Sequence, residues 1–221
     1  MKFVVDYSLN LDLQNYLSHV WRYNPDNLYG NDPKRFLNKF PLDFQQLLST
    51  ADTREKATEI IKNYWAKTRS INFNEMTQKA IFWTQKILDD EKLNIIKKLE
   101  TIYQQSFLFD QINVYLTTLP ICPFDYFHKW FMLQRNHGVP HLISTSIHEL
   151  NHFMFFYYYQ DNLIKQGIDQ SKINIVREAL AILSNPEGND KSDVKPLENY
   201  IKTIITKPIK EIIELSVKFL N

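Results

Sequence analysis

The sequence lacks the features that would point to an exported protein or to a highly charged partner. Its single cysteine, Cys122, excludes an intramolecular disulfide and a metal site made of several thiolates. The 26 lysines and arginines almost balance the 25 aspartates and glutamates, so a formal charge of +1 provides no long-range field towards nucleic acid or an anionic membrane. We therefore expect a cytoplasmic protein that binds neither nucleic acid nor membrane.

Long apolar runs are missing as well. Residues 1–6 reach an acidic residue after three apolar ones, and no h-region of a signal peptide follows. The most apolar stretch, residues 153–159, is far too short to span a bilayer. What the chain does contain is 44% hydrophobic and 14% aromatic residues over a length of 221. This is enough for one sizeable core, and we expect residues 1–221 to form one compact domain.

The first half of the chain has helical periodicity. From residue 9 to about residue 102, apolar residues recur at spacings of three and four. Within this half, residues 24–27 have turn chemistry and mark a loop. The chain has only four glycines, and all of them lie in surroundings that predict turns: Gly30, Gly138, Gly167 and Gly188. We expect residues 1–106 to be a helical half that forms one wall or roof of the molecule.

The character changes near residue 107. Residues 107–119 and 127–133 are rich in aromatic and branched residues and predict two strands. A long helix is predicted from about 141 to 159, and a second from about 171 to 184 with Asp169 or Ser171 as its N-cap. Residues 185–218 add two amphipathic helices broken near Pro208. The predicted fold is α+β and predominantly helical, with a core over 107–184 in which a small sheet packs beside two helices, and C-terminal helices over 185–221.

The segment His148-Glu149-Leu150-Asn151-His152 carries the chemistry. Residues four apart lie on one face of a helix, so the two imidazoles point the same way and match the spacing of zinc ligands. The glutamate lies beside them, where it can take a proton from a water that the metal activates. This HExxH arrangement is the pattern of zinc peptidases.

Catalytic zinc usually has a third protein ligand. Glu178 fits that role, because it follows in a predicted helix whose surroundings, including Ile175 and Ile182, are largely apolar. A carboxylate there would be costly unless it is paired or binds a metal. A surface position, or a pairing of Glu178 with a lysine or arginine elsewhere, is the alternative. Asp161 is a weaker candidate ligand, because we place it in the loop after the motif helix.

These motifs resemble those of the gluzincin branch of the zincin metallopeptidases. The resemblance covers roughly residues 108–184 and rests on His148 to His152 together with Glu178-Ala179-Leu180-Ala181. It implies Zn²⁺ held by His148, His152 and Glu178, Glu149 as general base, and hydrolysis of peptide bonds. It also implies a zincin-like core of strands followed by helices, with the active-site cleft between an α/β half and a helical half.

Two departures qualify the resemblance. Some gluzincins carry, four positions after the glutamate ligand, an acidic residue that supports a histidine, and Ile182 stands there in this chain. Asn174 is a candidate for that supporting role. The metzincin pattern is excluded, since it needs glycine and histidine where Phe155 and Tyr158 stand.

Several other residues are candidates for the site. His141 lies two helical turns before the first motif histidine and could contact the substrate or a ligand, although a solvent-facing position is equally compatible. The spacing singles out no donor for the developing oxyanion, and four residues are open candidates: His128, His137, Tyr157 and Tyr200. Cys122, between two prolines, is expected to be a small buried residue rather than a nucleophile.

The sequence thus predicts a zinc-dependent metallopeptidase that acts on a peptide or protein substrate. The upstream segment 127–134, predicted as an edge strand, would hold an extended peptide by main-chain pairing. Two alternatives come from other classes of protein: a zincin-like protein that binds zinc without turnover, and a metal-free helical interaction domain. The two histidines could then be satisfied by neighbouring side chains without a metal.

Overall fold

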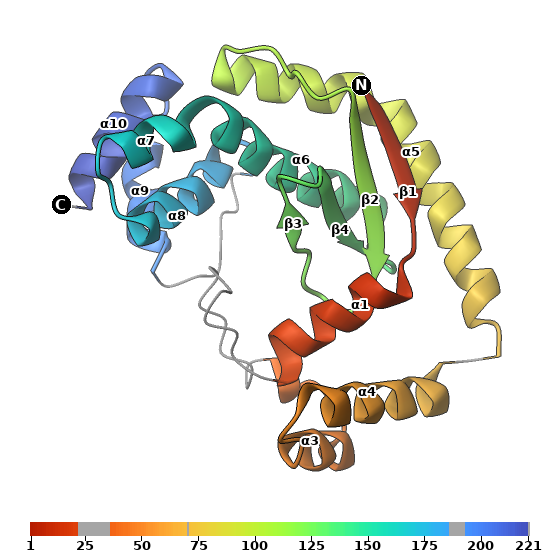
Figure 1. Cartoon of the computed structure of the whole chain (residues 1–221). Coiled ribbons are helices and arrows are strands. Elements are labelled where there is room, and N and C mark those ends of the chain that lie inside the picture. The colour runs from red at the N-terminus through yellow and green to blue at the C-terminus, as the bar shows by residue number, and fades with distance from the viewer. Residues whose placement is uncertain (22–35, 70, 186–192, 221) are drawn as a thin grey trace.

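The computed structural model describes residues 1–21, 36–69, 71–185 and 193–220 (Figure 1). The predicted turn at residues 24–27, Gly30 and Gly188 lie outside the described residues. The described chain is mostly helical and contains a four-stranded mixed sheet, which agrees with the predicted α+β class. Among its helices, none is both long and apolar enough to cross a bilayer.

The sheet has the order β1-β2-β4-β3. Its strands are β1 (Lys2–Asp6), β2 (Gln111–Thr117), β3 (Phe124–Asp125) and β4 (Trp130–Gln134). The first three strands in space run parallel, and the short β3 pairs antiparallel with β4 at the end of the sheet. Parallel pairing of β1 with β2 requires a long crossover, and all residues from 7 to 110 lie within it.

The sheet corrects three expectations. Strand β1 was not predicted, so the N-terminal half is not wholly helical. The predicted strand over 107–119 begins only at Gln111. The predicted edge strand, β4, lies between β2 and β3 because the chain folds back at a turn before it, so the edge position belongs to β3.

The crossover is helical, as the periodicity predicts. It contains α1 (Leu9–Tyr16), a π-helical turn η1 (Leu17–Trp21), α3 (Leu42–Ser49), α4 (Arg54–Thr68) and the 31-residue α5 (Phe73–Tyr103). Helix α5 packs against β1 and α6 (Val139–Phe155). Helices α1, α3 and α4 lie together beyond one end of the sheet (Figure 1).

The C-terminal part contains the two helices of the predicted site. After α6, the chain continues through the π-helix η2 (Phe156–Gln160), α7 (Asp161–Lys165), α8 (Gln170–Ala179), the 3₁₀ helix η3 (Leu180–Leu183), α9 (Lys195–Thr203) and α10 (Ile209–Phe219). The predicted break near Pro208 is confirmed, since it precedes α10. Helices α8, α9 and α10 pack on one another.

The apolar core of the described chain consists of two clusters. The larger one joins the sheet, α5, α6 and the C-terminal helices around fully buried side chains such as Phe3, Leu99 and Phe153. The smaller one joins α1, α3 and α4 around Phe44 and Ile61. The predicted site lies on helices of the larger cluster.

Candidate metal centre

Helix α6 presents the two motif histidines on one face. It begins after Gly138 with Pro140 in its first turn, where the missing N–H of proline costs nothing. His148 is half-buried and His152 is buried. Their Nε2 atoms lie 3.1 Å apart, because residues four apart stand one turn above the other. The α-helix thus places two potential nitrogen ligands side by side.

Helix α8 brings Glu178 to the same place. The Asp169 side chain caps this helix by accepting a hydrogen bond from the backbone N–H of Ser171, as predicted. Glu178 is 5% exposed, and its Oε1 lies 3.5 Å from Nε2 of His152. One ligand atom from each of the three residues lies within 4.8 Å of the others. His148, His152 and Glu178 therefore form a cluster that could hold a metal ion, and we call it the triad.

The donor set and its spacing fit zinc. Two imidazole nitrogens and a carboxylate oxygen are common ligands of catalytic zinc. Ligand atoms about 2.0–2.1 Å from a tetrahedral ion lie about 3.3–3.4 Å from one another. The Nε2–Nε2 distance of 3.1 Å and the Nε2–Oε1 distance of 3.5 Å lie on either side of that value. All three ligand atoms lie within 4.8 Å of one another, so the side chains would still have to close around an ion.

Glu149 is also buried, at 5% exposure, and lies near Cys122. Burial and, to a lesser degree, the negative charge of Glu149 raise the pKa of the Cys122 thiol to about 12. The thiol therefore stays protonated near neutral pH and is a poor nucleophile. Cys122 is half-buried rather than fully buried, and its raised pKa agrees with the expectation that it is not a nucleophile.

A residue that the sequence analysis missed contacts the triad directly. Arg177 is 1% exposed and donates a hydrogen bond from Nη2 to Oε1 of Glu178 at 3.2 Å. The alternative interpretation of Glu178, a pairing with an arginine, is thus met in part, although the partner is its own neighbour. A signal was available in the sequence: Ile173, Leu180 and Ala181 lie at helical offsets of three and four from this arginine, so the pattern indicates a buried position.

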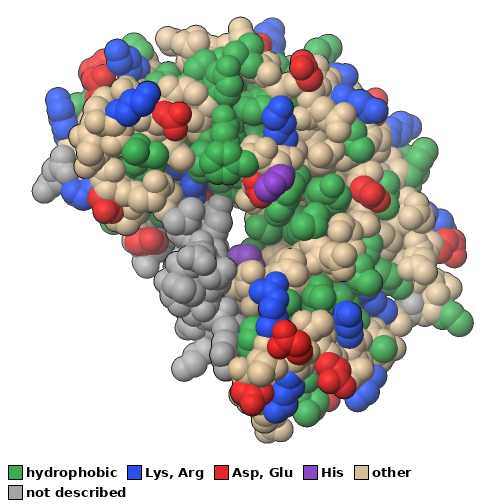
Figure 2. Space-filling model, in the orientation of Figure 1, with side chains coloured by type: hydrophobic (Ala, Val, Ile, Leu, Met, Phe, Trp, Pro, Cys, Tyr) green, Lys and Arg blue, Asp and Glu red, His purple; other side chains and the backbone are tan. Residues whose placement is uncertain are grey.

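Aromatic rings surround the same residues. The ring of Phe124, on β3, lies 4.9 Å from the His152 imidazole and 5.7 Å from the ring of Phe156. Tyr126 stacks on Phe156 at 5.0 Å, and the neighbouring Phe127 is 80% exposed. Figure 2 shows hydrophobic side chains gathered on this face of the molecule, with histidine side chains among them at the surface. An aromatic region therefore runs from the triad to solvent.

The other candidates make contacts with residues outside the triad. His141 is exposed in the first turn of α6 and its ring lies 5.6 Å from that of His137. Tyr157 is 48% exposed and contacts Phe109. Oδ1 of Asn174 accepts hydrogen bonds from Arg177 and Gln170, and its role as a support for a histidine stays a prediction.

The two remaining oxyanion candidates contact other residues. His128 pairs with Asp125 at 2.7 Å, and Tyr200 stacks on Phe219. The sequence predicted that Asp161 lies in a loop, and this is wrong. Asp161 is the first residue of α7, because the chain stays helical through η2. None of these three residues belongs to the cluster that the described chain offers to a metal.

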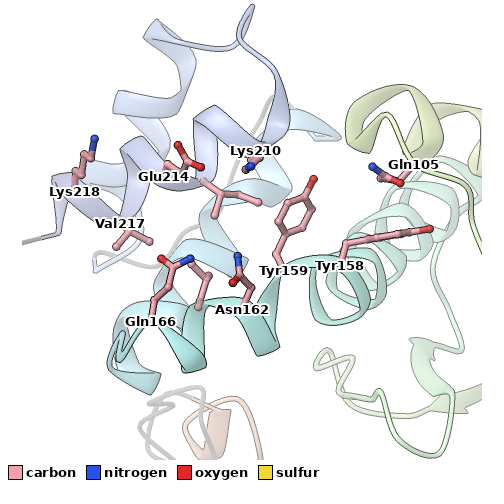
Figure 3. Close-up of a pocket in the computed structure, with 11 residues that line it drawn as sticks. Gln105, Tyr158, Tyr159, Asn162, Gln166, Lys210, Glu214, Val217 and Lys218 are labelled. Atoms are coloured by element: carbon pink, nitrogen blue, oxygen red, sulfur yellow. The ribbon is translucent and has the colours of Figure 1, made fainter.

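A separate cavity of about 510 Å³ lies between η2, α7 and α10 (Figure 3). Tyr159, Asn162 and Lys210 are among its lining residues, and Leu163 and Val217 contribute apolar surface. No residue of the triad lines it. Its wall from α10 packs against α8, the helix that carries Glu178, and η2 continues α6.

Comparisons of the chain with protein-family models, with curated proteins and with solved structures gave no match in any of the three. The resemblance to gluzincins therefore depends on the residues of the site itself.

Proposed function

We propose that this protein is a zinc-dependent peptidase. The observation that carries the proposal is the convergence of His148, His152 and Glu178, which come from two helices and lie with their ligand atoms within 4.8 Å of one another. Histidines four apart are common on helices, but a third ligand 26 residues further on, buried and in reach of both, is not required by local structure. Two imidazoles and one carboxylate leave a fourth position open for substrate.

Zinc bound by the triad would act as a Lewis acid that polarises the scissile carbonyl and makes water nucleophilic at neutral pH. Glu149 follows the first histidine directly on α6 and is buried, at 5% exposure. Its carboxylate would take a proton from the attacking water and pass it to the leaving amine.

The neighbourhood of the triad suits an extended apolar peptide. Strand β3 is the terminal member of the described sheet, and its Phe124 contacts the His152 ring. The outer edge of such a strand can pair with the backbone of an added segment. The adjoining rings of Tyr126 and Phe127 offer apolar surface to its side chains. These features favour a peptide or protein substrate.

A second candidate is a site that binds no metal or binds it without turnover. The contact from Arg177 to Glu178 favours it, because it gives the carboxylate a cationic partner from the chain itself. A buried ion pair of this kind can exist for structural reasons alone. The two candidates differ in metal content and in hydrolysis, and both can be measured.

The decisive experiment is elemental mass spectrometry of the purified protein beside a Glu178→Ala variant. We expect about one zinc per chain in the wild type and loss of most of it in the variant, because two histidines alone form a weak site. A Glu149→Gln variant should keep its zinc and lose about 10²–10⁴-fold of its turnover on a peptide library. Zinc-free wild-type protein after reconstitution, or full turnover by Glu149→Gln, would exclude the proposed mechanism.

A further inference from the structure

Arg177 is the most unusual charged residue of the described chain. It is the largest of the side chains buried to below 2% exposure. Fully buried arginines are rare, because removing a guanidinium from water is costly unless its charge and its N–H groups are matched. The reason for its burial should therefore lie in what it contacts.

The guanidinium is held from several sides. Nη2 donates to Oε1 of Glu178 at 3.2 Å, and Nη1 donates to Oδ1 of Asn174 at 3.3 Å. The guanidinium carbon lies 5.3 Å from the ring centre of Phe124 and 5.4 Å from that of Phe156. Aromatic faces attract a cation at such distances. These contacts fix the position of a side chain that would otherwise be flexible.

The contact with Glu178 does not follow from helix geometry. Consecutive residues on a helix diverge by about 100° and do not face each other. Arg177 meets its neighbour because the two aromatic rings and Asn174 hold its guanidinium near the carboxylate. The oxygen that it contacts, Oε1, is also the one that lies 3.5 Å from Nε2 of His152. The hydrogen bond therefore acts on the side of the carboxylate that faces the other ligands.

One ring connects the arginine with a histidine of the triad. Phe124 lies 4.9 Å from the His152 imidazole as well as 5.3 Å from the Arg177 guanidinium. A carboxylate oxygen has two lone pairs, so Oε1 can accept from the arginine and keep the other lone pair for a ligand bond. We propose that Arg177 is a positioning residue of the metal centre, which orients the Glu178 carboxylate towards the metal by a hydrogen bond from its guanidinium.

This inference rests on the proposed metal site and adds a role to a residue outside the motif. The positive charge of Arg177 could also weaken metal binding, since a cation near a divalent ion is repelled. Orientation outweighs that repulsion here, because Glu178 already offsets the charge of Arg177 and because a buried carboxylate without the arginine would turn towards other partners. Groups that hold metal ligands typically contribute 10–100-fold to metal affinity.

The test measures zinc affinity by competition with a chelator, and the absorption spectrum of the Co²⁺-loaded protein, for wild type and Arg177→Met. We expect zinc binding to weaken about 10–100-fold and the cobalt bands to shift, because the carboxylate no longer has a fixed orientation. The matched control is Arg69→Met, which removes an arginine–carboxylate contact of the same 3.2 Å at Asp12. The control should lower the melting temperature and leave zinc affinity and the cobalt spectrum unchanged.

Arg177→Lys keeps the charge but cannot reach Asn174 and Glu178 with one planar fork, so we expect intermediate weakening. It also serves if Arg177→Met does not fold. Zinc affinity that is unchanged or tighter in both variants would overturn the inference, and so would equal weakening in Arg69→Met. If the wild type itself binds no zinc or cobalt, both the proposed function and the inference about Arg177 are wrong. Tight binding by wild type and by both Arg177 variants would remove only the role of the arginine.

Discussion

Within the described residues, a buried carboxylate pairs with an arginine near each of the two core clusters. Arg69 reaches Oδ2 of Asp12 at 3.2 Å near the smaller cluster, and Arg177 reaches Oε1 of Glu178 at 3.2 Å within the larger one. Both guanidinium groups also lie over aromatic rings. The contacts are alike in length and chemistry, so the two carboxylates differ mainly in their other neighbours.

Asp12 is surrounded by hydrogen donors. It is fully buried, and its two oxygens accept from the hydroxyl groups of Tyr7, Thr117 and Thr118 as well as from the backbone N–H of Thr118. These donors come from the ends of β1 and β2, while Asp12 belongs to α1. The network therefore ties the helices of the smaller cluster to the sheet. With its lone pairs used in this way, Asp12 is suited to a structural role.

Glu178 instead faces groups that can supply lone pairs. Its nearest neighbours besides Arg177 include the Nε2 atom of His152, which itself lies 3.1 Å from Nε2 of His148. A neutral imidazole carries one acceptor nitrogen, and both acceptors can turn towards a cation. Converging acceptors repel one another unless a proton or a metal ion lies between them. The comparison thus separates a carboxylate whose oxygens accept from donors of the fold from one whose surroundings suit the metal ligand that we propose.

The largest expected effect comes from breaking the structural contact. Asp12→Asn leaves Arg69 without a counter-charge and turns an amide donor towards hydroxyl donors, so we expect the free energy of unfolding to fall by about 3–5 kcal/mol. Chemical denaturation of the metal-free protein measures this loss. Zinc content per folded chain should stay at the wild-type value. Loss of zinc in Asp12→Asn would show that the two regions are not independent.

Removal of the metal should lower the stability of the protein through the triad and leave the Asp12 network unaffected. At free zinc about 100 times the Kd, binding adds about 2.7 kcal/mol of stability, so stripping the metal should lower the melting temperature by about 5–10 °C. Thermal melts with and without a chelator measure the difference. Glu178→Ala should show almost none of it, and Asn15→Leu, a change in the Asp12 network, should show the full shift. A full chelator shift in Glu178→Ala would place the metal elsewhere.

The same contrast shows what could be predicted from the sequence. The proximity of His148 and His152 follows from local helix geometry, and the burial of Glu178 was expected from the apolar residues around it. Strand β1 was missed because five residues give little periodicity and its partner β2 lies more than 100 positions away, so the parallel pairing leaves no local trace.

The sequence also did not predict which charged side chains become buried by contacts between distant parts of the chain. Asp12 stands in the first turn of a helix, where an acidic residue is ordinarily solvated and favourable to the helix dipole, and only the folded sheet buries it. Arg177 had a visible signal in its apolar neighbours, yet its orientation depends on Phe124, which reaches it from β3. Sequence periodicity reports the face of a helix, and it does not report what a distant strand places against that face.

The smallest expected effect concerns a polar residue inside the motif itself. Asn151 is fully buried on α6, and neither its Oδ1 nor its Nδ2 has a hydrogen-bond partner among the described residues. Asn15 shares a partnerless Oδ1 but, by contrast, donates through Nδ2 to Thr117 and to the backbone carbonyl of Ile121. Because an unmatched buried amide is costly, Asn151→Leu should raise the free energy of unfolding by about 1 kcal/mol, whereas Asn15→Leu should lower it by about 1–3 kcal/mol.

Urea denaturation of both variants in the metal-free state measures these opposite signs, and zinc affinity should be unchanged in each. A destabilised Asn151→Leu protein with normal zinc affinity would mean that an internal water satisfies the amide and that the residue belongs to the structural class of Asp12. Weakened zinc binding in Asn151→Leu would instead assign the amide to the metal centre. The change in the free energy of unfolding and the zinc affinity of Asn151→Leu therefore decide whether Asn151 supports the fold, as Asp12 does, or the metal centre.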